Sequence, residues 1–386
     1  MSSVSPAYPD PMTTLHCFSG DFLLARRPPE PNRPLQAWDA ADEYLIDSFA
    51  EISPRPERVL ILNDQFGALT VALHANNPQN WGDSFTSRLA IEENLRLNHL
   101  PDSVAYTPST AIPPLPAYEA ILGRIPKSLA FWRQQLALLR PLLQENTVLL
   151  LAGMVKHLSS DAKEILTGLG TVEVFPVRKK ALLFRVTPHK DASLLPSPPE
   201  TILSLSEYSL EIGGGPNVFA REKIDEGTQL LLDQLPRIPV SSHIADLGCG
   251  NGLLGLVAKR LQPAAALYFF DESYQAVAAA EENYSRNNLS SQEPAALFSV
   301  DDGFSHYEGE LFDLILCNPP FHQGHVIGDQ IAWQMFTQSK WQLRPGGELW
   351  IVGNRHLNYH IKLKRIFGNC RQIAANPRFV VLSARR

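Results

Sequence analysis

Short apolar runs alternate with stretches of helical periodicity through the second half of this 386-residue chain, and this alternation restricts the possible folds more than any other feature. Strands are predicted at residues 243–247, 266–270, 297–300, 312–316 and 348–352, and helices at 253–261, 274–287 and 331–342. Strands separated by helices form parallel sheets that helices cover on both faces. Two later apolar runs, 371–374 and 379–382, predict an antiparallel hairpin that closes the sheet at its edge.

The first half of the chain repeats this plan in a degraded form. Residues 59–62 with Gly67 correspond to 244–247 with Gly252, residues 82–84 to 270–272, and residues 139–141 to 343–345. Three matches in the same order indicate a duplication. We therefore expect an α/β protein with two tandem Rossmann-like domains, of which the N-terminal one is degenerate.

Proline-rich and glycine-rich stretches mark the expected domain boundaries. Residues 1–34 are rich in proline and have little periodicity, which predicts an irregular lead-in. Residues 187–215 contain a proline cluster and end in three glycines, which predicts a linker, although 202–212 alternates like an edge strand or a hairpin. The two domains are accordingly expected at 35–186 and 216–386.

Composition excludes several classes of protein. With 44% hydrophobic and 19% charged residues, the chain is globular in composition rather than disordered. Its four cysteines lie far apart without a C-x-x-C pair, so we expect neither a zinc site nor a disulfide framework, and a reducing compartment fits. The sequence has no signal-peptide pattern and no apolar run near the roughly 18 residues of a membrane span. A cytoplasmic protein without a membrane partner is expected.

The net charge of −6 conceals a strong asymmetry. Residues 355–386 contain eight Lys and Arg and no acidic residue, and residues 123–190 contain eleven Lys and Arg against four acidic residues. Two basic stretches on an otherwise acidic chain are typical of a protein that binds a polyanion, and two solvated faces are the alternative.

The strongest local motif runs from a predicted strand into a predicted helix, as Ala245-Asp246-Leu247-Gly248-Cys249-Gly250-Asn251-Gly252. Glycines at such a turn let the backbone approach a ligand at the carboxyl end of a strand. The helix start offers free N–H groups to an anionic group. The spacing G-x-G-x-G differs from the dinucleotide-binding pattern G-x-G-x-x-G.

This motif resembles the S-adenosylmethionine loop of class I methyltransferases. In that family Asp246 lies near the methionine end of the cofactor, Asp271 binds the ribose hydroxyls, and Asp302 binds the exocyclic amine of adenine. Phe219 would cover the cofactor, with ordinary packing as the alternative. The cofactor-binding residues that the resemblance implies are Asp246, Gly248, Gly250, Gly252, Asp271, Asp302 and Phe219.

A second motif, Asn318-Pro319-Pro320-Phe321, directly follows the predicted strand 312–316. Two prolines keep the backbone extended and remove two N–H donors, so carbonyl acceptors dominate there. An exocyclic amine of a nucleobase is a poor nucleophile, because its lone pair is delocalised into the ring. The side-chain oxygen of Asn318 and the carbonyl of Pro319 can accept its two protons, which directs the lone pair at a methyl group. Phe321 offers a face on which the base can stack.

This motif is similar to the Asn-Pro-Pro-aromatic motif of methyltransferases that act on adenine N6, guanine N2 or protein glutamine amides. Other segments resemble the bacterial ribosomal RNA guanine-N2 methyltransferases: 217–221, 318–325, 332–336, 354–359 and 366–370. Residues 35–44 are most similar to the large-subunit type, with the small-subunit type as the near alternative. The resemblance extends from about Pro34 to the end of the sequence. It implies a catalytic C-terminal domain and a degenerate N-terminal copy that helps to hold RNA.

The residues themselves support this degeneracy. The first copy has Ile61, Asn63 and Gln65 where the second has Asp246, Gly248 and Gly250, and these side chains would block close approach by a cofactor. A basic turn at 124–127 replaces 318–321. The candidate phosphate-binding residues are Arg178, Lys179, Lys180, Arg355, Lys362, Lys364 and Arg365. His322 and His325 have no acidic or thiolate neighbours, so no metal site is expected.

The expected function is therefore S-adenosylmethionine-dependent methylation of the exocyclic N2 amine of a guanine in 23S ribosomal RNA, within ribosome biogenesis. The alternatives are 16S ribosomal RNA or a protein glutamine as the substrate, and a non-catalytic RNA-binding assembly factor that retains the fold. The intact residues of both motifs argue against the last alternative. No obligate protein partner is inferred.

Overall fold

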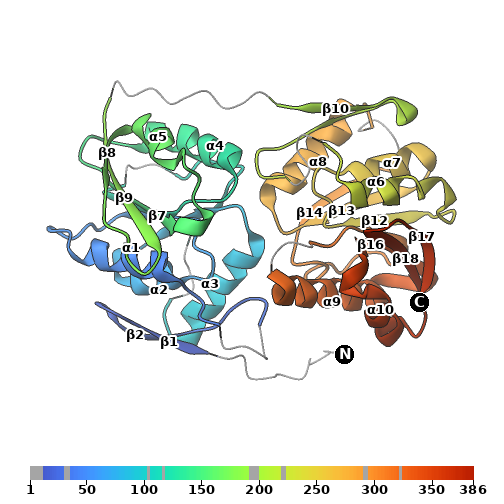
Figure 1. Ribbon diagram of the computed structural model, residues 1–386, viewed down its shortest axis with the longest axis horizontal. Helices are drawn as coiled ribbons and strands as arrows, with labels where there is room; N and C mark the ends of the chain where they lie inside the picture. Colours follow the sequence, from blue (N-terminus) through green and yellow to red (C-terminus); the bar gives the residue numbers. More distant parts are fainter. Residues whose placement is uncertain are drawn as a thin grey trace. The chain divides into compact units, whose positions relative to one another are not determined.

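The computed structural model describes residues 12–29, 35–101, 105–114, 118–190, 200–218, 223–289, 294–320 and 324–386, with the side chains of 324–329 left out. The chain divides into two compact units, 1–198 and 199–386. Each unit has its own seven-stranded sheet and its own hydrophobic core (Figure 1).

The C-terminal unit has the sheet order β14-β13-β12-β15-β16-β18-β17. Its strands are β12 (His243–Leu247), β13 (Ala266–Asp271), β14 (Leu297–Val300), β15 (Phe312–Cys317), β16 (Leu343–Asn354), β17 (Arg371–Ala375) and β18 (Phe379–Arg385). Strands β12 to β16 pair in parallel, whereas β18 pairs antiparallel with both β16 and β17. The prediction of a parallel sheet that an antiparallel hairpin closes is confirmed. The central strands β12 and β15 are buried almost throughout, which explains their continuous apolar runs.

Helices cover both faces of this sheet (Figure 1). One face carries α6 (Glu226–Leu232), α7 (Leu253–Leu261) and α8 (Tyr274–Arg286), and the other carries α9 (Gly324–Gln342) and α10 (Tyr359–Phe367). Asp225 caps α6 by accepting from the Gly227 N–H at 2.9 Å, and Ser273 caps α8 by accepting from the Ala276 N–H at 3.1 Å. Helix α9 begins seven residues before its predicted start, and α6 and α10 are additional to the predicted helices.

The N-terminal unit repeats this architecture, with the sheet order β5-β4-β3-β6-β7-β9-β8. Its strands are β3 (Val59–Leu62), β4 (Gln79–Gly82), β5 (Tyr106–Pro108), β6 (Ala120–Arg124), β7 (Val148–Met154), β8 (Gly170–Val174) and β9 (Ala181–Pro188). Its helices are α1 (Ala40–Ala50), α2 (Ala68–Ala72), α3 (Phe85–Leu97), α4 (Leu129–Leu139) and α5 (Ala162–Thr167). The two sheets match strand for strand, which confirms two copies of one fold.

An antiparallel hairpin precedes the sheet in each unit. The first is β1 (Thr13–Cys17) with β2 (Gly20–Leu24), and the second is β10 (Ile202–Leu205) with β11 (Leu210–Gly213). The hairpin at 202–212 was anticipated, but the expectation of an irregular lead-in is wrong for 13–24. Those residues are ordered because the side chains of Leu15, Phe22 and Leu24 are buried in the core.

In each unit, an asparagine at the end of a helix forms a hydrogen bond with the hairpin. The side-chain oxygen of Asn98 accepts from the Leu23 N–H at 2.8 Å, and that of Asn287 accepts from the Glu211 N–H at 2.8 Å. We therefore propose that each copy begins at its hairpin, rather than at residues 35 and 216.

Candidate active site

The carboxyl edge of the C-terminal sheet gathers the residues of both motifs. Strands β14, β13, β12 and β15 are consecutive neighbours in a parallel array, so the residues that follow them meet at one edge. The Gly250 N–H donates to Oδ2 of Asp271 at 3.0 Å, which joins the glycine loop to the end of β13. A Cβ built on Gly248 would lie 4.0 Å from the backbone oxygen of Asn318, which places the second motif beside the loop.

The glycine loop depends on backbone conformations that other residues rarely adopt. Gly248, Gly250 and Gly252 have φ angles of +71°, +55° and +81°, in the left-handed region that favours glycine. A Cβ on Gly252 would lie 3.0 Å from Cβ of Ala280, whereas for one on Gly250 the nearest atom among the described residues, its chain neighbours apart, is a methyl carbon of Val218 at 3.8 Å. The backbone at Gly250 is therefore open to a ligand, as a cofactor loop requires.

Asp246 at the end of β12 is fully buried with an incomplete set of hydrogen bonds. Its Oδ2 accepts from the Gly255 N–H at 2.8 Å, whereas its Oδ1 has no hydrogen-bond partner within the described part of the chain. Burial raises the pKa of Asp246 to about 8, although the Gly255 N–H opposes the shift, and the charge of Asp271 makes a smaller contribution in the same direction as burial. A buried acceptor without a partner is costly, so this oxygen fits a ligand that brings an N–H or cationic donor.

Asp271 is the last residue of β13, and Asp302 is the second residue after the neighbouring strand β14. Oδ1 of Asp271 accepts from the Ser273 N–H at 3.0 Å, which fixes the carboxylate at the end of β13. Oδ1 of Asp302 accepts from Nε2 of Gln334 at 2.9 Å. The neighbouring Asp301 is buried and accepts from the backbone of Asp302 and from His306, so it stabilises its own turn.

Asn318 directly follows β15, and the two ends of its side-chain amide have different surroundings. Its Nδ2 donates to the hydroxyl of Thr228 at 2.8 Å, and its Oδ1 is buried without a hydrogen-bond partner among the described residues. Sequence reasoning missed Thr228, because it lies 90 residues away in the chain and belongs to no motif. Pro319 is buried and Pro320 is half-buried, and the backbone after Asn318 leaves the sheet there. Phe321 and Phe219 lie outside the described residues.

The equivalent loop of the N-terminal copy is filled by its own side chains. Asn63, with a φ of +58°, takes the place of Gly248. Its Nδ2 donates to the backbone oxygen of Arg124 and to Oε1 of Gln135, both at 2.9 Å. Asp64 is buried and accepts from the Gly67 N–H and from the backbone and hydroxyl of Thr70. The structure thus supports the expectation that this loop excludes a cofactor.

One of the sequence matches between the two copies is wrong by one residue. The Asn63 N–H bonds the Trp81 carbonyl at 3.0 Å, just as the Gly248 N–H bonds the Phe270 carbonyl at 2.8 Å. Gly82 therefore corresponds to Asp271, and the match of 82–84 with 270–272 is wrong. A Cβ on Gly82 would lie 2.8 Å from the hydroxyl of Tyr106. The first copy has neither the carboxylate at this position nor the space for a ribose.

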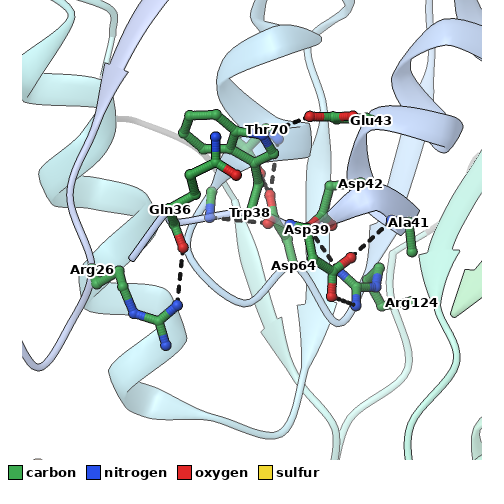
Figure 2. Close-up of polar contacts among 11 residues, drawn as sticks. Arg26, Gln36, Trp38, Asp39, Ala41, Asp42, Glu43, Asp64, Thr70 and Arg124 are labelled. Atoms are coloured by element: carbon green, nitrogen blue, oxygen red, sulfur yellow. Dashed lines mark hydrogen bonds and ion pairs between the residues drawn. The ribbon is translucent and has the colours of Figure 1, made fainter. Parts of the chain in front are cut away.

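Arg124 takes the place of Asn318 in the N-terminal copy, and Figure 2 shows it between two carboxylates. Its guanidinium donates to Asp42 at 2.6 Å and to Asp39 at 2.7 Å. Burial alone would lower the pKa of Arg124, but the two carboxylates outweigh burial and raise it. The turn at 124–127 is therefore less basic than expected, because the charge of Arg124 is neutralised inside the domain.

The predicted RNA-binding residues of the N-terminal copy differ in their surroundings. Arg178 pairs with Asp47 at 2.7 Å and Lys179 with Glu43 at 2.6 Å, so acidic side chains of α1 neutralise both.

Lys180 is exposed and has no ion pair within the described residues. Its carbonyl accepts from the Val155 N–H, which places it beside the turn with exposed Lys156. Exposed Lys127 follows β6 on the same sheet edge. We call Lys127, Lys156 and Lys180 the N-terminal lysine cluster.

Burial and then the charges of Lys127 and Lys156 lower the pKa of His157.

The C-terminal candidates lie on or just before α10. The guanidinium of Arg355 donates to the Asn376 carbonyl at 3.1 Å. Lys362 lies over the ring of Tyr359 and Arg365 over the ring of Trp333, at 5.3 and 5.2 Å from the centroids, and Lys364 is exposed. These four residues therefore lie on one short segment, 355–365.

No cluster of three or more His, Cys, Asp or Glu side chains suited to a metal ion occurs among the described residues. Within the same residues, no helix combines the length and the hydropathy that crossing a bilayer requires.

Comparison with known proteins identifies both halves. Residues 209–383 match the family model of the methyltransferase small domain, and residues 12–190 match that of the RLMG N-terminal domain. A solved 16S rRNA N2 methyltransferase from T. thermophilus, in complex with AdoMet and guanosine, is 21% identical, with a TM-score of 0.75 over 97% of this chain and 98% of that chain. That likeness shows the tandem fold.

Curated relatives are much more similar in sequence. A ribosomal RNA large subunit methyltransferase G from Stutzerimonas stutzeri is 45% identical over 93% of this chain and 96% of its own length. Proteins of the same name from Yersinia enterocolitica and Pseudomonas aeruginosa are each 43% identical over 94% of this chain, and over 92% and 96% of their own lengths. The chain therefore belongs to the ribosomal RNA large subunit methyltransferase G family.

Proposed function

We propose that the C-terminal copy binds S-adenosylmethionine and methylates the exocyclic N2 amine of a guanine in 23S ribosomal RNA. The observation that carries this proposal is the buried Oδ1 of Asn318 beside the glycine loop, which has no hydrogen-bond partner in the part of the chain that the structure describes. Membership of a family named for large-subunit ribosomal RNA favours 23S over 16S RNA. Ribosomal RNA as the substrate would place the enzyme in the cytoplasm.

The residues of the loop fit the cofactor chemically. Asp246 would face its ammonium group, Gly250 would allow close backbone approach, Asp271 would bind the ribose hydroxyls and Asp302 the adenine amine. When bound, the cofactor supplies an electrophilic methyl group. Phe219 lies outside the described residues, and its role as a cover for the cofactor stays a prediction.

Asn318 would act on the substrate amine. Its Oδ1 accepts one N–H of the guanine N2 amine and the Pro319 carbonyl accepts the other, which draws the nitrogen towards a tetrahedral shape. The amine lone pair then points towards the methyl group instead of into the purine ring. Phe321 would stack on the base. Because these acceptors strengthen their bonds as the nitrogen attacks, they stabilise the transition state more than the bound substrate.

The substrate is tested by incubating the protein with unmodified 23S and 16S ribosomal RNA and mapping methylated guanines by mass spectrometry. We expect N2-methylguanine at one position of 23S RNA, absent from the 23S RNA of a strain that lacks the gene. Modification of 16S RNA alone would reassign the substrate, and methylation of neither RNA would leave a glutamine substrate or an assembly role.

Asp246 predicts a pH-dependent cofactor affinity. With its pKa at about 8 in the free protein, Asp246 is largely protonated below pH 8 and must lose that proton to pair with an ammonium group. The ratio of wild-type to Asp246→Asn affinity should therefore fall as the pH is lowered from 8 to 6, by up to about tenfold per pH unit. Calorimetry at several pH values measures it, and the ratio cancels the titration of the cofactor's own amine. A constant ratio would contradict this role of Asp246.

The N-terminal lysine cluster predicts a salt-dependent contribution to RNA binding. Changing Lys127, Lys156 and Lys180 to Gln together should weaken RNA binding and reduce the slope of log affinity against log salt by about 2 to 3. Changing Arg178 and Lys179 to Gln should have a smaller effect, because Asp47 and Glu43 already neutralise them.

Lys163→Gln on α5 is the matched control, and cofactor affinity should stay constant in every variant. An unchanged salt slope in the triple variant would show that this copy does not hold RNA through these lysines.

A further inference from the structure

Three side chains of the C-terminal unit form a hydrogen-bonded series that ends at Asn318. Oδ1 of Asp225 accepts from the backbone N–H groups of Gly227 and Thr228, at 2.9 and 3.3 Å. Oδ2 of Asp225 accepts from the hydroxyl of Thr228. The oxygen of that hydroxyl accepts in turn from Nδ2 of Asn318 at 2.8 Å. The series thus links the N-terminus of α6 to the residue after β15.

The donors and acceptors in this series can be arranged in one way only. An ionised carboxylate accepts and does not donate, and a hydroxyl has a single hydrogen. Because Thr228 donates that hydrogen to Asp225, it can only accept from Asn318. The carboxamide must therefore direct its NH₂ group at Thr228, and its oxygen points the other way. That oxygen is the buried Oδ1 without a partner among the described residues.

We propose that Asp225 and Thr228 are positioning residues that fix the orientation of the Asn318 carboxamide, so that its oxygen and not its nitrogen faces the substrate amine. The inference rests on the function proposed above for Asn318. The two ends of a carboxamide have nearly the same shape, so packing alone distinguishes them poorly. A reversed Asn318 would direct N–H donors at an amine that needs acceptors.

The N-terminal copy has an equivalent arrangement at the start of α1, but it binds an arginine instead of an asparagine (Figure 2). Asp39 is the N-cap of α1 as Asp225 is of α6, and Asp42 stands three residues later, where α6 has Thr228. Both carboxylates bind Arg124, the residue that takes the place of Asn318. Two acceptors select a guanidinium, whereas a carboxylate with a hydroxyl selects an amide NH₂ group and leaves the amide oxygen to the active site. In each copy, side chains at the helix N-terminus bind the residue that follows or ends the fourth strand.

Asp225→Asn tests the orientation directly. An Asn at 225 can still cap α6 through its oxygen, but its NH₂ group would now donate to Thr228. The Thr228 hydroxyl would then donate to Asn318 and turn the carboxamide round. We expect the single-turnover rate of methyl transfer to 23S RNA to fall about 10- to 100-fold, less than the 10²–10³-fold loss typical of removing an oriented polar group, because Asn318 itself is retained. The cofactor Kd and the KM for RNA should remain at wild-type values.

Three further variants distinguish a changed orientation of the Asn318 carboxamide from a general loss of folding. Thr228→Val removes the hydroxyl and should also lower the rate, whereas Thr228→Ser retains it and should restore most of the rate. Glu226→Gln removes a charge from the same turn of α6, outside the series, and should turn over like the wild type. The Thr228 pair decides the matter even if the Asp225 variant does not fold.

A double variant distinguishes this inference from the proposed function. In an Asn318→Ala background, Asp225→Asn should change the rate little, because its effect passes through Asn318. An equal loss in both backgrounds, wild-type rates for Asp225→Asn and Thr228→Val, or a changed cofactor Kd would overturn the positioning role alone. A wild-type rate for Asn318→Ala by itself would instead refute the function proposed for Asn318.

Discussion

Asn318→Ala should lower the single-turnover rate of methyl transfer by about 10²–10³-fold, the range seen when one preorganised polar group is removed from an active site. The physical reason is that the hydrogen bond from the substrate amine to Oδ1 strengthens as the nitrogen becomes tetrahedral. Cofactor binding should change little. RNA affinity should also change little, because phosphate contacts elsewhere dominate it.

Asn318→Asp is the matched control for this prediction. It keeps an acceptor on the side of the substrate, but it loses the N–H that bonds Thr228 and adds a charge. Partial activity is expected, between the wild type and the alanine variant. The measurement is methyl transfer to 23S RNA with saturating cofactor, and a wild-type rate for Asn318→Ala would remove the residue from the mechanism.

Asp271→Ala should weaken S-adenosylmethionine binding by about 1.5–3 kcal/mol, the usual range for hydrogen bonds to a charged group. The variant loses the proposed ribose contacts and also the bond from the Gly250 N–H that holds the glycine loop. Asp271→Asn keeps one of the two acceptor oxygens and should lose less. Calorimetry gives the affinity of each variant, and unchanged binding by the alanine variant would place the ribose elsewhere.

The same titration of the wild type should give one mole of cofactor per mole of protein. The N-terminal copy has Gly82 where the other has Asp271, and its loop is filled by Asn63 and Asp64. A stoichiometry of two would show that this copy still binds the cofactor.

Much of the C-terminal copy could be predicted from its sequence because its signals are local. The strands 243–247 and 297–300 and the helix 253–261 have the predicted bounds. Each is an apolar run or a helical period between turn residues, and its conformation depends on neighbours a few positions away. The glycine loop is of the same kind, since the positive φ angles of Gly248, Gly250 and Gly252 explain why glycine stands there.

The errors occurred where a segment depends on distant residues. The hairpin at 13–24 lies in a proline-rich region, and its order comes from the buried core and from Asn98 at the end of α3, 75 residues from its partner Leu23. The match of the two copies is displaced by one residue at Gly82, and the backbone bond between Asn63 and Trp81 shows the correct equivalence. Basic residues at 178 and 179 suggested free cations, but acidic residues of α1 neutralise them.

The sequence by itself determined the α/β fold, the duplication and the two motifs, because periodicity and backbone sterics act over short stretches of chain. Only the tertiary structure decided how the polar side chains at these sheet edges are oriented and whether their charges are neutralised. The orientation of Asn318 depends on Asp225 and Thr228, and the loss of a free charge at Arg124 depends on Asp39 and Asp42, all more than 80 residues distant along the chain. Such pairs form where the chain returns to the same sheet edge, and no local preference encodes which groups will meet there.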